Sequence, residues 1–230
     1  MTDQPPGPDF ETILASTIHD MKNSLGTLIN AIDGFSQRVE TTMPAMQQEL
    51  HPVQAEARRL NNHLVQLLAL YRMGRGEFAV NPRQVAVADF LHEAFFEFES
   101  VFVTGGLTVD IDCDDDLVWV FDDNLVMGVV RNALNNLVRY ARRRVRLSAK
   151  LEGEWLAMRV EDDGEGYPQS IIEMVGPEAH AMNFRNSSTG LGLYFASRVM
   201  AGHEHRGSRG TMELGNGGGL GGGVFTLHLP

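Results

Sequence analysis

Cysteine is almost absent from this sequence of 230 residues, and the one cysteine lies in an acidic run. Cys113 has no second thiol in the chain with which to form a disulfide, so a reducing compartment is expected. The aspartates on both sides, Asp112 and Asp114, oppose the negative charge of a thiolate. A reactive thiol is therefore not expected here.

Long hydrophobic runs and an excess of positive charge are also missing. No stretch of about 18 apolar residues occurs, so no membrane-spanning helix is expected, and no signal peptide follows the polar, proline-rich residues 1–9. The chain has 19 Lys and Arg against 30 Asp and Glu, a net charge of −11. Nucleic-acid and anionic-membrane surfaces normally carry a basic excess. We expect a cytoplasmic protein with neither nucleic acid nor a membrane as its partner.

Two helical patterns fill the N-terminal third. Apolar residues recur at steps of three to five over 10–42 and again over 46–71, which predicts two long amphipathic helices. Pro44 is expected to end the first helix, and Pro52 to mark the first turn of the second helix or a kink in it. A single antiparallel hairpin cannot bury both apolar stripes. The pattern therefore predicts a homodimer that forms a four-helix bundle.

The pattern changes after Gly74-Arg75-Gly76, which is the predicted domain boundary. We expect a polar tail at 1–9, a helical domain at 10–74 and a second domain at 78–230. In the second domain, strands are expected at 85–87, 107–112, 118–121, 145–150, 155–161 and 224–229, and helices at 88–103, 123–140 and 191–200. The predicted fold class is α+β, with the second domain an α/β sandwich on a largely antiparallel sheet. The glycine-rich stretch 215–223 is expected to be a flexible loop, and Trp119 and Trp155 are expected in the core.

Two helical segments carry polar residues at spacings that suit phosphoryl chemistry. His19 and Asn23 are four residues apart and share a helix face, with Asp20 beside them. A neutral imidazole is a competent nucleophile, and a nearby carboxylate can orient it or take its proton. Asn132 and Asn136 offer amide oxygens that suit Mg²⁺, and the helix continues to Arg139 and Tyr140. Each segment alone also fits an ordinary polar helix face.

Two glycine-containing segments complete the set. Asp162-Asp163-Gly164-Glu165-Gly166 follows a predicted strand, so a carboxylate at the strand end can accept a hydrogen bond from an amine of a flat ligand. Ser188-Thr189-Gly190-Leu191-Gly192-Leu193 opens a predicted helix, where backbone N–H groups attract anions such as phosphate. A simple turn explains the first segment equally well when it is taken alone.

In this order and spacing, the four segments resemble the H, N, G1 and G2 boxes of sensor histidine kinases of two-component systems. The resemblance covers about residues 10–230, including the closing segment 225–230. It implies a helical dimerisation and phosphotransfer domain followed by a GHKL-type ATPase domain, with ATP and Mg²⁺ as cofactors. Three substitutions depart from the family pattern: Ser24 stands where proline is common, Arg139 where lysine is frequent, and Ser188 where the first glycine is usual.

The resemblance also implies a role for each matched residue. His19 would accept the phosphoryl group, Asp20 would be its acidic partner, and Asn23 would position water for dephosphorylation of a response regulator. Asn132 and Asn136 would serve the metal, Asp162 would hold the adenine amine, and 167–187 would form a lid. The residues that it places at the nucleotide are Asn132, Asn136, Arg139, Tyr140, Asp162, Gly164, Gly166, Thr189, Gly190, Leu191 and Gly192.

The function implied is a histidine autokinase that passes its phosphoryl group from His19 to the receiver domain of a response regulator. Two alternatives stay open: a phosphotransfer or scaffold protein with a silent ATP-binding domain, and a protein that acts mainly as a regulator phosphatase. Only about nine residues precede the first helix. We therefore expect either that an upstream sensor protein supplies the signal or that the chain is an excised core.

Overall fold

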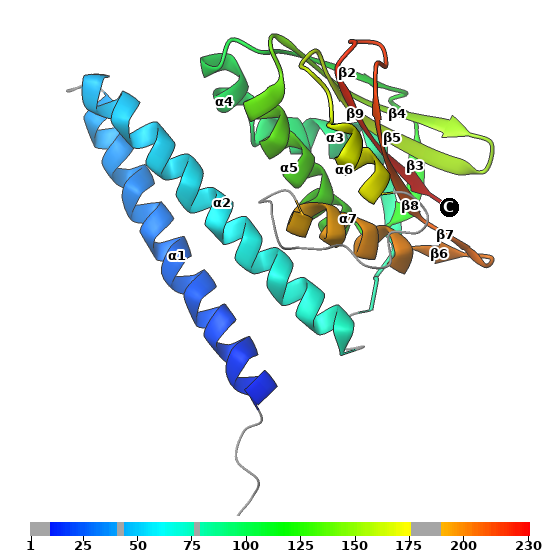
Figure 1. Ribbon diagram of the computed structural model, residues 1–230, viewed down its shortest axis with the longest axis horizontal. Coiled ribbons are helices and arrows are strands. Elements are labelled where there is room, and N and C mark those ends of the chain that lie inside the picture. The colour runs from blue at the N-terminus through cyan, green and yellow to red at the C-terminus, as the bar shows by residue number, and fades with distance from the viewer. Residues whose placement is uncertain (1–9, 41–43, 76–78, 176–189) are drawn as a thin grey trace, which may run out of the picture. The chain divides into compact units, whose positions relative to one another are not determined.

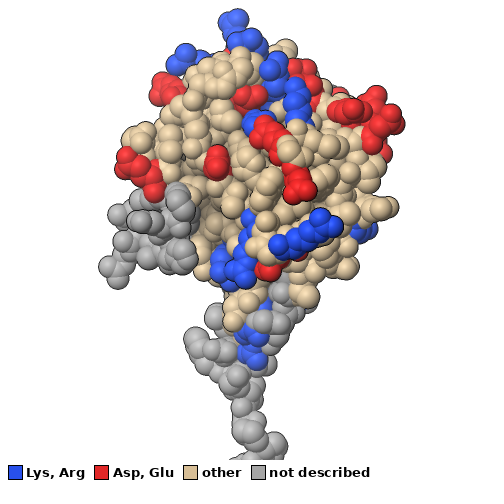
Figure 2. All heavy atoms as spheres, turned by 90° about the vertical axis from the view of Figure 1, so that its right-hand side faces the viewer, with Lys and Arg blue, Asp and Glu red and all other residues tan. Residues whose placement is uncertain are grey.

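The computed structural model describes residues 10–40, 44–75, 79–175 and 190–230. The chain divides into two compact units, Met1–Phe78 and Ala79–Pro230. None of the helices in the described part is long and apolar enough to cross a membrane. On the face shown in Figure 2, acidic side chains lie among the basic ones, and no broad basic surface forms there.

The first unit is a hairpin of two long antiparallel helices, α1 (Phe10–Glu40) and α2 (Pro44–Gly74) (Figure 1). Pro44 is the first residue of α2, a position where the missing N–H of proline costs nothing, and α2 continues through Pro52. Arg58 of α2 forms an ion pair with Asp33 of α1 at 2.8 Å. Ile18 and Ala57 are buried inside the hairpin. The two predicted helices are therefore both present.

The second unit is a two-layer α/β sandwich. It contains β1 (Arg83–Ala86), α3 (Val87–Phe96), α4 (Glu99–Thr104), β2 (Thr108–Cys113), β3 (Val118–Phe121), α5 (Asp123–Tyr140), β4 (Arg144–Glu152), β5 (Trp155–Asp162), α6 (Gln169–Met174), α7 (Gly190–Gly202), β6 (Glu204–His205), β7 (Ser208–Arg209), β8 (Thr211–Asn216) and β9 (Gly223–Leu229). The main sheet has the order β2-β4-β5-β9-β8, and α3, α5 and α7 lie together beside it (Figure 1). Only the β2–β4 pair is parallel; the other pairs are antiparallel. This agrees with the mixed sheet-and-helix fold expected for this part of the chain.

Two expectations about the backbone of this unit were wrong. The helix predicted over 88–103 is broken after Phe96, and Phe95 and Phe98 both stack on the buried Phe102. The glycine-rich stretch is a hydrogen-bonded connection between two strands and not a free loop, because β8 extends to Asn216 and the N–H of Gly217 donates to Gly222 O at 2.8 Å. Tertiary packing of the aromatic rings and pairing with β9 decided both outcomes.

The start of α5 is held by a buried polar contact. Asp122 caps the helix by accepting from the N–H of Leu125 at 3.1 Å, and it also accepts from Asn81 N at 2.9 Å. The N–H of Asp122 in turn donates to Nε2 of His203 at 3.0 Å, while Nδ1 of His203 lies 2.9 Å from Val199 O. Because a carbonyl only accepts, Nδ1 must carry the proton and His203 is neutral. Burial lowers the pKa of His203, which favours the same neutral form.

Candidate functional site

The hairpin carries the three residues of the predicted phosphotransfer segment on α1. His19 and Asn23 are one helical turn apart, with Asp20 next to His19. The side chains of Asp20 and Asn23 are exposed. All the predicted nucleotide residues belong to the second unit, so the two sets stand on separately folded parts of the chain.

The second half of α5 carries the predicted asparagines, Arg139 and Tyr140. Asn132 and Asn136 are half-buried, whereas Arg139 and Tyr140 are exposed at the helix end. The guanidinium of Arg139 lies 6.0 Å from the centre of the Tyr140 ring. A cation and an aromatic ring are therefore presented together at the end of the helix.

Asp162, at the end of β5, is the buried carboxylate of the site, with 4% of its surface exposed. Its Oδ1 accepts from the N–H groups of Gly164 at 2.7 Å and Gly223 at 3.2 Å. Its Oδ2 accepts no hydrogen bond from the described residues. One oxygen thus anchors the side chain to the backbone, and the other is left to accept from a ligand.

Asp163 has a different role from its neighbour. Its Oδ1 accepts from the backbone N–H groups of Arg142, Arg143 and Arg144 at 2.9, 2.9 and 3.0 Å. Partial burial opposes ionisation of Asp163, but these hydrogen bonds outweigh it and lower the pKa of the carboxyl group. A methyl group at position 164 would collide with the carbonyl of Tyr140. The loop after β5 is therefore fastened to the end of α5.

A second fastening joins the loop after β5 to β8. Asn216 accepts from Tyr167 N at 2.7 Å and donates to Tyr167 O at 2.9 Å. Gly166 has a φ of 81°, a left-handed conformation that favours glycine. Burial, and then the charge of Asp162, raises the pKa of Tyr167. The uncharged phenol ring therefore packs beside Asp162.

The glycine-rich connection between β8 and β9 packs against the end of β5 and the loop that follows it. Gly219 N donates to the buried Glu161 at 2.9 Å, and Gly222 N donates to Asp162 O at 3.0 Å. Any side chain at position 222 would collide with the backbone of Asp162 and Gly164. Close approach of the two backbones requires glycine at this point.

The start of α7 contributes Gly190, Leu191 and Gly192. Gly192 packs against the side-chain amide of Asn132, where a methyl group would collide. The structure thus joins the asparagine segment of α5 to the glycine segment of α7. Thr189, Ser188 and most of the proposed lid lie outside the described residues.

The sequence reasoning missed Glu161, Asp163, Asn216 and the backbone of the glycine-rich connection. The run of glycines between 215 and 223 was the available signal, since so many glycines are needed only where backbones approach closely. Nothing in the sequence pointed to Asn216, because its partner Tyr167 is 49 residues away.

Comparison with known proteins agrees with this arrangement. Residues 121–230 match the family described as "Histidine kinase-, DNA gyrase B-, and HSP90-like ATPase". The adaptive-response sensory kinase SasA of Synechocystis is 25% identical over 205 residues, which cover 84% of this chain and 53% of SasA. Sensor protein PhoQ of Escherichia coli is 23% identical over 209 residues, covering 90% of this chain and 41% of PhoQ.

These matches support the sensor histidine kinase family for this chain, as the resemblance predicted. The ATPase-type domain supports ATP as its ligand. The chain spans only about half the length of the relatives named above.

Solved structures support the fold of the chain. The histidine kinase AdeS of Acinetobacter baumannii matches with a TM-score of 0.60 and 18% identity over 90% of this chain and 96% of that chain. Full-length ShkA in complex with AMPPNP matches with a TM-score of 0.63 and 19% identity over 94% of this chain and 46% of that chain.

Proposed function

We propose that this protein is an ATP-dependent histidine autokinase that phosphorylates His19 and passes the phosphoryl group to an aspartate of a response-regulator receiver domain. One observation carries the proposal. The asparagine segment of α5, the buried Asp162 and the glycines of α7 meet in an ATPase-family domain whose chain also holds His19 on a helical hairpin.

ATP fits the residues that meet in the second unit. The free Oδ2 of Asp162 suits the adenine amine, and the neutral ring of Tyr167 beside it suits a flat base. Arg139 offers a positive charge for phosphate. The glycines at 164 and 192 leave room where a side chain would collide with neighbouring groups. The similar protein ShkA was solved with the ATP analogue AMPPNP.

Mg²⁺ would be held by the amide oxygens of Asn132 and Asn136, which are one turn apart on α5. When bound, the ion would neutralise charge on the phosphates. The described residues contain no group of three or more His, Cys, Asp or Glu side chains that could hold a metal. The phosphates themselves would therefore supply the anionic ligands.

The residues of this chain have simple tasks in the proposed reaction. A nitrogen of His19 attacks the γ-phosphorus of ATP, the bond to the β-phosphate oxygen breaks, and ADP leaves. Asp20 orients the imidazole or takes its proton. The aspartate of the regulator then attacks the phosphohistidine and restores His19. Catalysis comes mainly from positioning and charge neutralisation.

The hairpin also supports the proposed homodimer. Seven large apolar side chains, each between 41% and 52% exposed, recur every seventh residue along both helices. On α1 they are Met21, Leu28 and Phe35, and on α2 they are Met46, Val53, Leu60 and Leu67. We call this set the heptad face. Its spacing is that of helices which pack against a partner helix, so a second hairpin would cover it.

Labelling with γ-labelled ATP tests the acceptor. We expect His19→Ala to lose the acid-labile label while keeping its nucleotide affinity, because the nucleotide residues stand on the other unit. His92→Ala, an exposed histidine on α3, is the matched control and should label normally. A His19→Ala protein that still acquires the label would rule out His19 as the acceptor.

Calorimetry with ATP tests the nucleotide site. Asp162→Asn should weaken binding about tenfold or more, because the buried acceptor loses its charge. Asp89→Asn, on the exposed surface of α3, should bind as the parent does. If the parent itself binds no ATP, the scaffold alternative with a silent domain is correct.

A regulator phosphatase is the second candidate function, and the exposure of Asn23 one turn after His19 favours it. An amide there can hydrogen-bond a water molecule in line with an aspartyl phosphate. We expect Asn23→Ala to keep autokinase activity and lose most of its phosphatase activity, while His19→Ala retains some. The measurement is the decay of a phosphorylated regulator, and equal decay with Asn23→Ala and the parent contradicts this role.

We further propose that the protein acts in the cytoplasm, receives its signal from an upstream sensor protein, and binds no nucleic acid. The net charge of −11 supports the last point. The chain matches 53% of SasA and 41% of PhoQ, and a separate sensor protein would supply a signal to such a catalytic core.

A further inference from the structure

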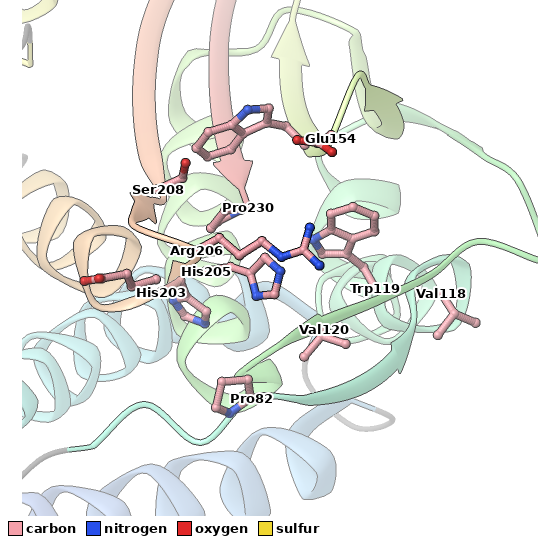
Figure 3. A pocket seen from close by; sticks show the side chains of 12 residues that line it. Pro82, Val118, Trp119, Val120, Glu154, His203, His205, Arg206, Ser208 and Pro230 are labelled. Atoms are coloured by element: carbon pink, nitrogen blue, oxygen red, sulfur yellow. The ribbon is translucent and has the colours of Figure 1, made fainter.

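A pocket of about 520 Å³ lies in the second unit, lined by β3, the β6–β7 hairpin, the turn between β4 and β5 and the two prolines Pro82 and Pro230 (Figure 3). It lies near the start of α5, since His203, which holds Asp122, is one of its lining residues. Tyr140 and the loop after β5 are at the other end of this helix of 18 residues, about 25 Å away. The pocket is therefore separate from the candidate nucleotide site.

Both tryptophans of the chain line this pocket. Trp119 and Trp155 are half-buried, which corrects the expectation that they belong to the core. Val118 and Val120, on the same strand as Trp119, are 52% and 53% exposed and add apolar surface. The volume and the aromatic lining suit a small ligand with an apolar body.

The pocket residue Trp119 has a buried hydrogen-bond donor without an acceptor in the described part of the chain. The indole nitrogen of Trp119, Nε1, is buried and has no hydrogen-bond acceptor among the described residues. A buried N–H without an acceptor destabilises a protein, whereas a ligand oxygen would satisfy it.

A cation reaches into the same pocket. Arg206 lies in the two-residue turn of the β6–β7 hairpin with a φ of 50°, a left-handed conformation that residues other than Gly and Asn rarely adopt. Its guanidinium forms no ion pair with any described residue and extends toward the side of the pocket where Trp119 lies (Figure 3). Glu204 is neutralised by Arg209 at 2.9 Å, and Glu154 lies on the exposed turn between β4 and β5.

We propose that this pocket binds a small monocarboxylate with an aromatic or branched apolar body. The carboxylate accepts from the guanidinium of Arg206 and from Nε1 of Trp119, and the body lies between the two indoles. A carboxylate is preferred to a neutral acceptor because it matches both the unpaired cation and the orphan donor. A bound ligand would contact His203, whose Nε2 accepts from the N–H of Asp122 at the start of α5.

Tryptophan fluorescence of the full chain tests the proposal directly, because both tryptophans belong to the pocket. The probe is phenylacetate, compared with phenylacetamide, which keeps the body but lacks the charge, and with acetate, which lacks the body. We expect a saturable change with phenylacetate that persists at saturating ATP. Phenylacetamide and acetate should each bind at least about tenfold more weakly.

Arg206→Gly is the informative variant, because glycine suits the left-handed turn and the fold should be retained. It should weaken phenylacetate binding about tenfold or more, and Trp119→Phe should also weaken it, with Trp155 as the remaining reporter. Arg198→Ala, an exposed arginine on α7, is the matched control and should bind as the parent does. Equal binding of phenylacetamide, unchanged binding by Arg206→Gly, competition with ATP, or no saturation at all would each overturn the proposal.

Discussion

The hairpin and the second unit bury their apolar residues in different ways. In the hairpin, only Ile18 and Ala57 are fully buried among the apolar residues whose side chains are described, while the heptad face stays exposed. The second unit closes its own core, with Phe102, Phe121 and Leu134 at 0% exposure. A unit that completes its own core can be stable by itself, whereas the exposed heptad face is the reason that we propose a second hairpin as its partner.

Charges placed on the heptad face should have the largest effect. The double variant Leu28→Asp, Leu60→Asp should weaken the proposed dimer about a thousandfold or more. The four half-exposed leucines per dimer would contribute about 0.7–1.5 kcal/mol each, and the introduced carboxylates would add a desolvation cost. Light scattering measures the loss. Val103→Asp, at an apolar residue 70% exposed on α4, should leave the oligomeric state unchanged. A double variant that is still dimeric at micromolar concentration would refute the heptad-face interpretation.

A core truncation in the second unit should behave in the opposite manner. Phe121 packs edge-to-face on Phe90, with 5.2 Å between ring centres, so Phe121→Ala should destabilise this unit by about 3–5 kcal/mol. Denaturant unfolding followed by tryptophan fluorescence should give a loss that does not depend on protein concentration. Val120→Ala, on the exposed face of the same strand, should change stability by less than about 0.5 kcal/mol. A concentration-dependent loss would mean that the second unit also needs a partner.

The buried histidine gives the second unit a dependence on pH. The pKa of His203 is lowered in the folded state from 6.5, so below that pH the unfolded chain binds a proton that the folded chain excludes. Stability should therefore fall as the pH decreases through this range.

The variant His203→Gln isolates this effect. It should be less stable than the parent by about 1–3 kcal/mol near neutral pH, because a buried hydrogen-bond network is altered. The difference should narrow as the pH falls, since glutamine does not titrate. Urea unfolding at about pH 7.5 and about pH 5.5 measures it, with the exposed His205→Gln as the control. A constant difference would show that His203 does not carry the pH dependence.

The smallest effect is expected for the ion pair between the hairpin helices. Asp33 and Arg58 have 31% and 58% of their side chains exposed, so water and salt screen the pair. Asp33→Asn should cost the hairpin about 0.2–1 kcal/mol, and less at high salt. Thermal unfolding of the dimer at two salt concentrations is the measurement. A larger loss that salt does not reduce would show that packing around Asp33 matters more than its charge.

Local patterns predicted the elements that depend on neighbours along the chain. The helix expected over 123–140 is α5, Asp123–Tyr140, because its apolar spacing and the cap at Asp122 are both local. The hairpin expected from 145 to 161 is β4–β5, in which polar and apolar residues alternate along β4 and a glycine turn leads into the largely apolar β5. Asp162, Gly164 and Gly192, which the resemblance places at the nucleotide, were also visible as short motifs, since they lie at a strand end, in the bend that follows it and at a helix start.

Contacts between segments far apart in the chain could not be predicted from local sequence patterns. Asp163 reaches back to the amides of 142–144, Asn216 clamps Tyr167 across 49 residues, and His203 holds Asp122 across 81. The short strands β6 and β7 were missed because two residues cannot show a period.

The sequence alone determined the two-part organisation, the long helices and the order of the four boxes, because periodicity and short motifs are properties of neighbouring residues. Only the tertiary structure decided that the glycine-rich connection lies on Glu161 and Asp162, that Asp163 binds the backbone that follows α5, and that Arg206 and a buried indole N–H without an acceptor among the described residues share one pocket. These features depend on which backbones approach one another once the sheet has closed. That closure depends on the whole chain and not on any local pattern.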